Sequence, residues 1–70
     1  MLVKHSVLIA GHATSVTLEP EFWEALKEIA AAERKSLNAL VQEVDRERSG
    51  NLSSALRLFV LRRLRASSTS

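Results

Sequence analysis

The chain has 70 residues, with 10 Lys and Arg, 8 Asp and Glu, and no cysteine. A domain this small buries a thin core and usually needs a disulfide, a metal or a partner chain for stability. Disulfides and thiolate metal sites are excluded without cysteine, whose absence also fits a cytoplasmic protein. No apolar run approaches the roughly 20 residues that cross a bilayer. These properties predict one small domain that is stabilised by oligomerisation.

The charges are segregated along the chain. All 8 acidic residues lie between Glu19 and Glu47, and the residues before Glu19 carry Lys4 but no acid. From Arg48 onward there are arginines and no acid. An anionic partner would therefore be steered to the two ends of the chain. Alternatively, the late arginines simply lie near a helix C-terminus, where the helix dipole favours positive charge.

The two histidines, His5 and His12, are the only nitrogen ligands for a metal, and neither has an acidic neighbour in sequence. In a regular strand their spacing places them on opposite faces. We therefore expect no metal site and no cofactor.

Two strands are predicted at the N-terminus. Residues 3–10 are rich in apolar and β-branched side chains, and residues 13–19 form a second segment of strand formers. Gly11-His12 separates them, and glycine at the first of two loop positions favours a type II′ hairpin turn.

The second strand has one apolar and one polar face, because Val16 and Leu18 alternate with Ser15 and Thr17. A lone strand is not stable and must pair. If it pairs antiparallel with the same strand of a second chain, the apolar face seals the helices and the hydroxyls of both chains point outward together.

A first helix begins at Pro20, which suits the first helical turn, and Glu19 and Glu21 complement the helix dipole. Its buried stripe has helical spacing and consists of Phe22, Leu26, Ile29 and Ala30, widened by Trp23.

A second helix follows the N-cap Ser36 and is expected to stop at Ser49-Gly50-Asn51. Its stripe consists of Leu37, Leu40, Val41 and Val44. A third helix is capped by Asn51 or Ser53, and its inward positions are Leu52, Ala55, Leu56, Phe59, Val60 and Leu64. Its apolar surface is broad, which favours burial against a partner subunit. Residues 66–70 are small and polar and are predicted to be disordered.

The stretch SVTLEPEFWEALKEIAAAERKSLNALVQEV resembles the ribbon-helix-helix superfamily of bacterial and phage DNA-binding proteins, which includes the Arc and MetJ repressors. The resemblance covers about residues 13–48 and is closer still to a compact subgroup with an added third helix. It implies a mainly α fold with a short β ribbon, built as an intertwined homodimer. The expected divisions are an N-terminal strand or arm in 1–12, a ribbon-helix-helix domain with a third helix in 13–65, and a tail in 66–70.

The resemblance also implies functional residues. The base-reading positions of the ribbon match Ala13, Ser15 and Thr17, although Ala13 offers only a methyl group. The phosphate clamp at the start of the second helix matches Ser36, Leu37 and Asn38, with Lys35 close by, and a helix N-terminus is a ready anion site. Lys4 and His12 are additional candidates for phosphate contact. The expected core and dimer residues are Val16, Leu18, Phe22, Trp23, Leu26, Leu40, Val41, Val44, Leu56 and Phe59.

The sequence favours two functions and disfavours a third. The first is a dimeric, sequence-specific regulator, in particular a repressor, that inserts an antiparallel ribbon into the major groove of double-stranded DNA and assembles further on it. The second is an antitoxin or adaptor whose third helix or N-terminal arm binds a partner protein. An enzyme is disfavoured, because no nucleophile–base pair, glycine-rich phosphate loop or metal cluster is present. The expected location is a bacterial or phage-type cytoplasm, on the nucleoid and away from membranes.

The place of the N-terminal strand in the dimer is left open by the sequence. If it folds back as a hairpin, a dimer carries four strands with a combined width of roughly 15 Å, against a major groove of about 12 Å. The strand then either swaps onto the partner, packs aside, becomes ordered on binding, or changes how the sheet meets DNA.

Overall fold

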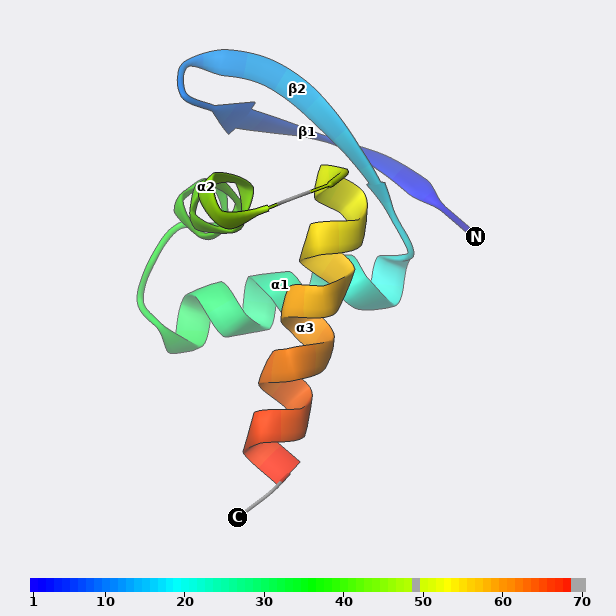
Figure 1. Ribbon diagram of the computed structural model, residues 1–70, viewed down its shortest axis with the longest axis vertical. Helices are drawn as coiled ribbons and strands as arrows, with labels where there is room; N and C mark the ends of the chain where they lie inside the picture. Colours follow the sequence, from blue (N-terminus) through cyan, green and yellow to red (C-terminus); the bar gives the residue numbers. More distant parts are fainter. Residues whose placement is uncertain (49, 69–70) are drawn as a thin grey trace.

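The computed structural model describes residues 1–48 and 50–68. The elements in chain order are β1 (Val3–Ile9), β2 (His12–Leu18), α1 (Pro20–Ala32), α2 (Leu37–Glu47) and α3 (Leu52–Ser68). Figure 1 shows the hairpin lying across one end of the molecule, with the helices beneath it. A two-stranded antiparallel sheet followed by three helices confirms the predicted mainly α fold with a short β ribbon, an extra N-terminal strand and a third helix.

The hairpin turn differs from the prediction. Ile9 pairs with His12, so the turn residues are Ala10 and Gly11, and His12 belongs to β2. The backbone φ angle is 52° at Ala10 and 81° at Gly11. Positive φ at both central positions is the mark of a type I′ turn, whose twist matches that of the flanking strands. The predicted type II′ turn at Gly11-His12 is therefore wrong by one residue.

The pairing register sets which side chains face the helices. The helix-facing residues are Val3, His5, Val7, Ile9, His12, Thr14, Val16 and Leu18. Among them Val7, Val16 and Leu18 are buried. The two histidines share this face, contrary to the expectation of opposite faces, because the turn between them reverses the chain.

The His5 ring stacks on the Trp23 indole of α1, with the ring centroids 3.8 Å apart and the planes 5° from parallel. This stack ties β1 to the first helix. Within the described residues no group of His, Cys, Asp and Glu has the arrangement of a metal site.

The outer edge of β1 is bound to α2. The Leu8 amide donates to Asn38 Oδ1 at 3.3 Å and the Ala10 amide donates to Gln42 Oε1 at 3.4 Å. Asn38 and Gln42 are four residues apart on a helix, which is about 6 Å, and Leu8 and Ala10 are two residues apart in extended chain, which is about 6.6 Å. The two side-chain amides of α2 are therefore spaced to accept from these two backbone amides. These bonds cover the turn end of an edge that would otherwise be unpaired there.

The core forms within one chain. Of the residues expected in the core or dimer interface, six are buried here: Val16, Leu18, Leu26, Leu40, Val41 and Leu56. The other four are partly buried and pack against that core: Phe22, Trp23, Val44 and Phe59. β1 of the same chain takes the position beside β2 that was expected for a strand of a second chain.

The end of α1 is a Schellman motif centred on Arg34, whose φ angle is 58°. The Lys35 amide donates to Ala30 O at 3.0 Å and the Arg34 amide donates to Ala31 O at 3.1 Å. The position usually held by glycine is therefore occupied by arginine, at a conformational cost.

The α2–α3 corner also departs from the prediction in part. α2 ends at Glu47 because Arg48 is extended, with φ −73° and ψ 150°, while Ser49 lies outside the described residues. Gly50 does not have the positive φ of a glycine cap, since Gly11 alone has it among the described glycines. The cap of α3 is Asn51, whose Oδ1 accepts from the Ser54 amide at 2.9 Å.

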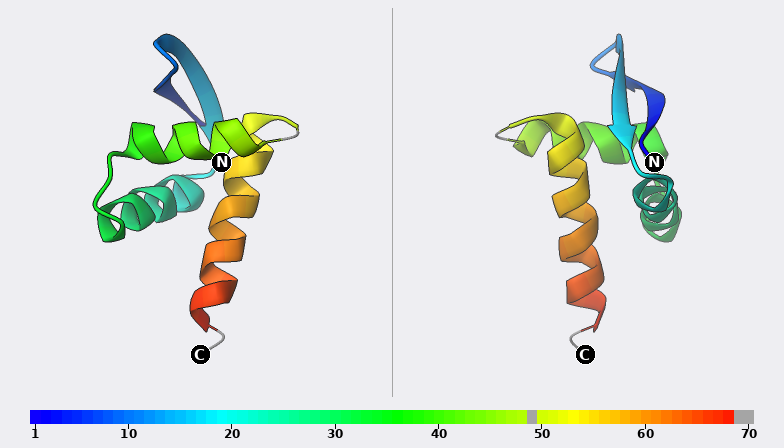
Figure 2. Two further views of the ribbon diagram at one scale, coloured as in Figure 1. Left: turned by 60° about the vertical axis from the view of Figure 1, so that its left-hand side comes forward. Right: turned by 90° about the vertical axis from the view of Figure 1, so that its right-hand side faces the viewer.

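The third helix continues beyond Arg65 to Ser68, so residues 66–68 are helical rather than disordered, and 69–70 lie outside the described residues. No glycine or proline interrupts the helical hydrogen bonds there. Figure 2 shows α3 leading away from the hairpin, so its C-terminal end lies far from the strands.

Candidate nucleic-acid interface

The outer face of the hairpin consists of three cross-strand pairs. They are Lys4 with Thr17, Ser6 with Ser15, and Leu8 with Ala13. All six residues are exposed, and none is acidic. We call this set the outer face.

The predicted base-reading residues Ala13, Ser15 and Thr17 share this outer face, as their alternate spacing along β2 requires. Neighbouring members are separated by about 6.6 Å, which is two residues of strand. Lys4 lies opposite Thr17 and adds a positive charge, while Leu8, which is 49% exposed, lies opposite Ala13. The face can therefore offer hydroxyl donors and acceptors, methyl groups and one cation.

The second edge of β2 is open along part of its length. The Thr17 amide points away from β1 and donates to Ser53 Oγ of α3 at 3.3 Å. Since strand amides alternate between edges, the Ala13 and Ser15 amides point to this same edge. Neither of them donates to another described residue.

The N-terminus of α2 lies at the edge of β1. Ser36 caps it by accepting from the Ala39 amide at 3.0 Å. The Leu37 and Asn38 amides have no acceptor among the described residues, as expected in a first helical turn. The Asn38 side chain binds the Leu8 amide, so this helix end lies beside the outer face.

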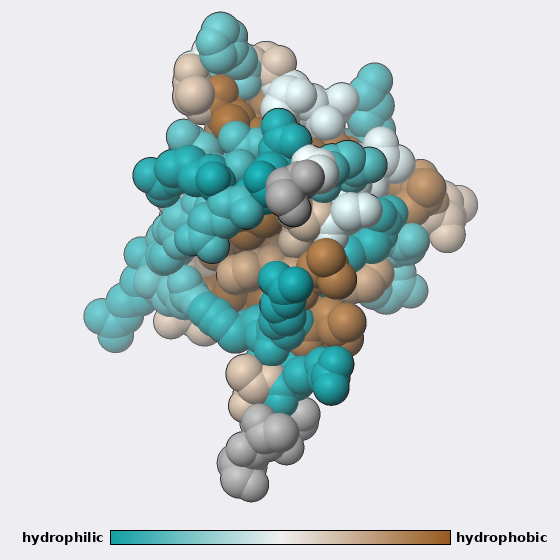
Figure 3. All heavy atoms as spheres, viewed as in Figure 1, coloured by the Kyte–Doolittle hydropathy of each residue, from teal (hydrophilic) through white to brown (hydrophobic). Residues whose placement is uncertain are grey.

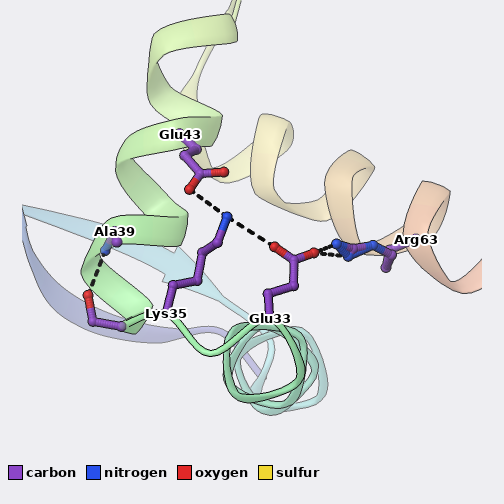
Figure 4. Close-up of polar contacts among 6 residues, drawn as sticks. Glu33, Lys35, Ala39, Glu43 and Arg63 are labelled. Atoms are coloured by element: carbon purple, nitrogen blue, oxygen red, sulfur yellow. Dashed lines mark hydrogen bonds and ion pairs between the residues drawn. The ribbon is translucent and has the colours of Figure 1, made fainter.

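The Lys35 side chain is turned into a network of ion pairs. Its Nζ lies 3.1 Å from Glu33 Oε1 and 2.7 Å from Glu43 Oε2. Figure 4 shows the Glu33 carboxylate between Lys35 and Arg63, with which it also pairs. The Lys35 charge is therefore partly neutralised by two carboxylates beside the α2 N-terminus.

His12 lies apart from the outer face. It is exposed at the turn end of the hairpin, on the side that faces the helices. With Thr14, Arg48 and Asn51 it lines an open hollow of about 420 Å³. Lys4 therefore shares the outer face with the predicted base-reading residues, whereas His12 lies on the opposite face and adjoins one of them, Ser15, at this hollow.

One arginine of α3 is bound at the start of α1. Arg57 Nε donates to Glu19 Oε1 at 2.9 Å. This hydrogen bond is the main cause that lowers the pKa of the Glu19 carboxyl below its usual value. A second arginine, Arg63, also lies over the Phe59 ring, at 5.6 Å from its centroid. These two cations serve contacts within the chain.

Sequence reasoning missed the contribution of β1 to this interface. Ser6 and Leu8 share the outer face with the predicted residues; the alternation of Lys4 and Ser6 with less polar neighbours was a usable signal for Ser6, while the apolar run around Leu8 hid its outward position. Gln42, which binds the Ala10 amide, left no signal of its own, because an amide on a helix is usually just a solvated side chain.

A polar ribbon lying over a small helical core defines a class of compact DNA-binding domains. The comparison with family models agrees with this class, since the ribbon-helix-helix domain model matches residues 2–64. The chain belongs to the ribbon-helix-helix family. A search of curated proteins and a search of solved structures gave no match.

Ribbon-helix-helix domains are DNA-binding regulatory domains rather than enzymes, and they generally form dimers. Typical members of the family are transcription regulators or antitoxins. Along the described part of the chain, no helix has the length and apolar character needed to cross a membrane.

Proposed function

We propose that the chain is a sequence-specific, dimeric transcriptional repressor that places its β ribbon in the major groove of DNA, on the nucleoid of a bacterial or phage-infected cell. The observation that carries the proposal is the outer face. It gathers Ala13, Ser15 and Thr17 on one exposed surface with Lys4 and without an acid.

The chemistry of this face suits base edges. The Ser15 and Thr17 hydroxyls can donate to or accept from the bases, and the methyl groups of Thr17 and Ala13 can contact thymine methyls. Two strands about 5 Å apart fit within a groove of about 12 Å. Specificity then rests on a few hydroxyl contacts on each chain.

The proposed dimer forms along the open edge of β2. A second copy can pair antiparallel there, through the free amides of Ala13 and Ser15. The two β2 strands then form the centre of a four-stranded sheet and insert in the groove. The β1 strands lie to either side, where Lys4 can meet the phosphate backbones. Only the two central strands enter the groove, so the whole four-stranded sheet can be wider than the groove.

Phosphates are held at the start of α2 in this proposal. The free amides of Leu37 and Asn38, next to the Ser36 cap, can bind one phosphate oxygen each. Lys35 adds positive charge nearby, although its ammonium is shared with Glu33 and Glu43. His12 can add a contact only beyond the turn end of the hairpin.

The test compares Thr17→Glu with Thr14→Glu. The two residues lie on the same strand and both are exposed, but Thr17 is on the outer face and Thr14 is on the other face. Operator duplexes are first selected from a random library with the wild-type protein. Fluorescence anisotropy at low salt then gives the dissociation constant of each variant.

We expect Thr17→Glu to abolish specific binding, since it places a carboxylate against bases and phosphates, while Thr14→Glu retains most of the affinity. Circular dichroism checks that both variants are folded. Equal losses in the two variants, or no enrichment of any sequence in the selection, would remove the outer face from the mechanism.

The alternative function is an antitoxin or adaptor that binds a protein. It is favoured by apolar side chains left in solvent, because Met1 and Leu2 of the N-terminal arm are 97% and 55% exposed and Leu64 of α3 is 56% exposed. Co-purification of a stoichiometric small protein with the chain expressed from its native operon supports this alternative. The two functions are compatible in one molecule.

A further inference from the structure

A groove lies in the corner between α2 and α3, and none of its lining residues belongs to the hairpin. It has a volume of about 320 Å³. Its apolar floor is formed by Val44 of α2 and by Ala55, Leu58 and Phe59 of α3. We call this the α2–α3 groove.

The two walls of the groove carry opposite charges. Glu47 lines the α2 side and Arg62 lines the α3 side, and both are exposed. Neither forms an ion pair with another described residue, whereas Glu43 on the same rim is engaged by Lys35. The groove therefore presents one free acid and one free base on opposite sides of an apolar floor.

The α3 wall of the groove is also an apolar ridge. Leu58 and Leu61 are each 47% exposed and lie one helical turn apart on the solvent side of α3. In Figure 3 apolar surface appears along the middle of α3, between hydrophilic side chains. Helices pack by fitting a ridge of side chains on one into a groove on the other, and this surface has both a leucine ridge and an apolar groove.

We propose that the α2–α3 groove is a self-association surface that binds the α2–α3 groove of a second copy about a two-fold axis. In this pairing Leu58 of each copy enters the groove of the other. Glu47 of each copy meets Arg62 of the other, so two ion pairs flank the leucines.

Charge complementarity selects a second copy as the occupant. In a two-fold contact a residue of one copy meets a different residue of the other and the reverse pair forms as well, so charges away from the axis can pair only if the patch contains both signs. An acidic partner would leave Glu47 repelled, and a basic partner would leave Arg62 repelled. A surface with one of each, on opposite walls, is complementary to itself.

This surface goes beyond the proposed function, because it does not depend on DNA and does not involve the β2 edge. A chain with both contacts assembles as a tetramer of two ribbon dimers, which can span neighbouring operator sites. Because the two contacts lie on different elements, each is open to separate mutation.

The first experiment measures the mass of the full chain by sedimentation equilibrium over a range of protein concentrations without DNA. Leu58→Glu places a carboxylate in both copies of the contact. Leu64→Glu is the matched control, since Leu64 is 56% exposed on the same helix but does not line the groove. We expect Leu58→Glu to halve the wild-type mass, with association weakened by roughly thirty-fold or more, and Leu64→Glu to leave it unchanged.

The second experiment reverses the two wall charges. Glu47→Arg alone and Arg62→Glu alone place like charges together at the contact and should each weaken association. The double variant restores opposite charges across it and should recover the wild-type mass at low salt. This recovery is not expected if the single variants act by disturbing the fold of one chain.

The proposal is overturned if the wild-type chain is a monomer, or if its mass is unaffected by Leu58→Glu in a variant that melts normally. It is also overturned if the double charge reversal associates no better than the single variants. In any of these cases the groove is free for a different protein, as the antitoxin alternative requires. The DNA-binding comparison of Thr17 and Thr14 is decided independently of all three outcomes.

Discussion

Replacing Leu18 by alanine tests which face of β2 is buried. Leu18 ends the strand, is 0% exposed and belongs to the core formed under the hairpin. Removing a fully buried leucine side chain costs about 2–5 kcal/mol, because transfer free energy is lost and a cavity is left. A chain of 70 residues has a total stability of roughly 4–10 kcal/mol at typical values per residue. Leu18→Ala should therefore lose a large share of the free energy of unfolding.

The matched control is Leu8→Ala, which makes the same change in the same hairpin on the outer face. Leu8 is 49% exposed, so the substitution should cost no more than about 1 kcal/mol. Urea unfolding followed by circular dichroism gives both values. The variants are compared at one protein concentration, because self-association makes stability concentration-dependent.

We expect the melting temperature to fall by roughly 10 °C or more for Leu18→Ala and by a few degrees for Leu8→Ala. A one-residue slip in strand register would exchange the two faces. Equal losses, or a larger loss for Leu8→Ala, would refute the register and with it the assignment of the outer face.

Two further predictions concern the helix junctions. Arg34→Gly should raise the free energy of unfolding, measured by urea titration, by up to about 1 kcal/mol, because the φ angle of 58° suits glycine. The control variant Arg34→Ala keeps the Cβ atom and should show no such gain. Glu19 has a lowered pKa through Arg57, so the pair contributes stability above the unfolded pKa near 4.5 that is lost as the pH falls through the folded pKa. Glu19→Gln should therefore be less stable than wild type at pH 7, and this difference should shrink in low-pH thermal melts and at high salt; a constant difference contradicts the role of the ion pair.

Several features of the fold were predictable because they depend on local rules. Ser36 was identified as a cap from its residue type and position, and its hydroxyl accepts from the Ala39 amide. The alternation along β2 placed Val16 and Leu18 inward and Ser15 and Thr17 outward, and the burial of these residues agrees. Period and capping chemistry act within a few residues, so they can be read along the chain.

The hairpin turn was predicted one residue too late, because Gly11 suits either the first or the second central position of a two-residue turn. The type I′ turn needs positive φ at Ala10 as well, which alanine disfavours and which the pairing of Ile9 with His12 imposes. The end of α3 was placed too early for a related reason. Small polar residues at a chain terminus usually fray, but here the helix continues through residues 66–68.

The sequence by itself determined the elements, their apolar faces and the family resemblance, because periodicity, caps and turn residues act locally. The tertiary structure decided what those elements contact. It paired β2 with β1 of the same chain and turned Lys35 toward Glu33 and Glu43. It also placed Glu47 and Arg62 on the two walls of the α2–α3 groove, neither of them in an ion pair with a described residue. These contacts join residues far apart in the chain, and no local rule selects one distant partner over another. For the same reason, the outward face of β2 was predictable from alternation, while its open edge and its neighbours on β1 became apparent only in the folded chain.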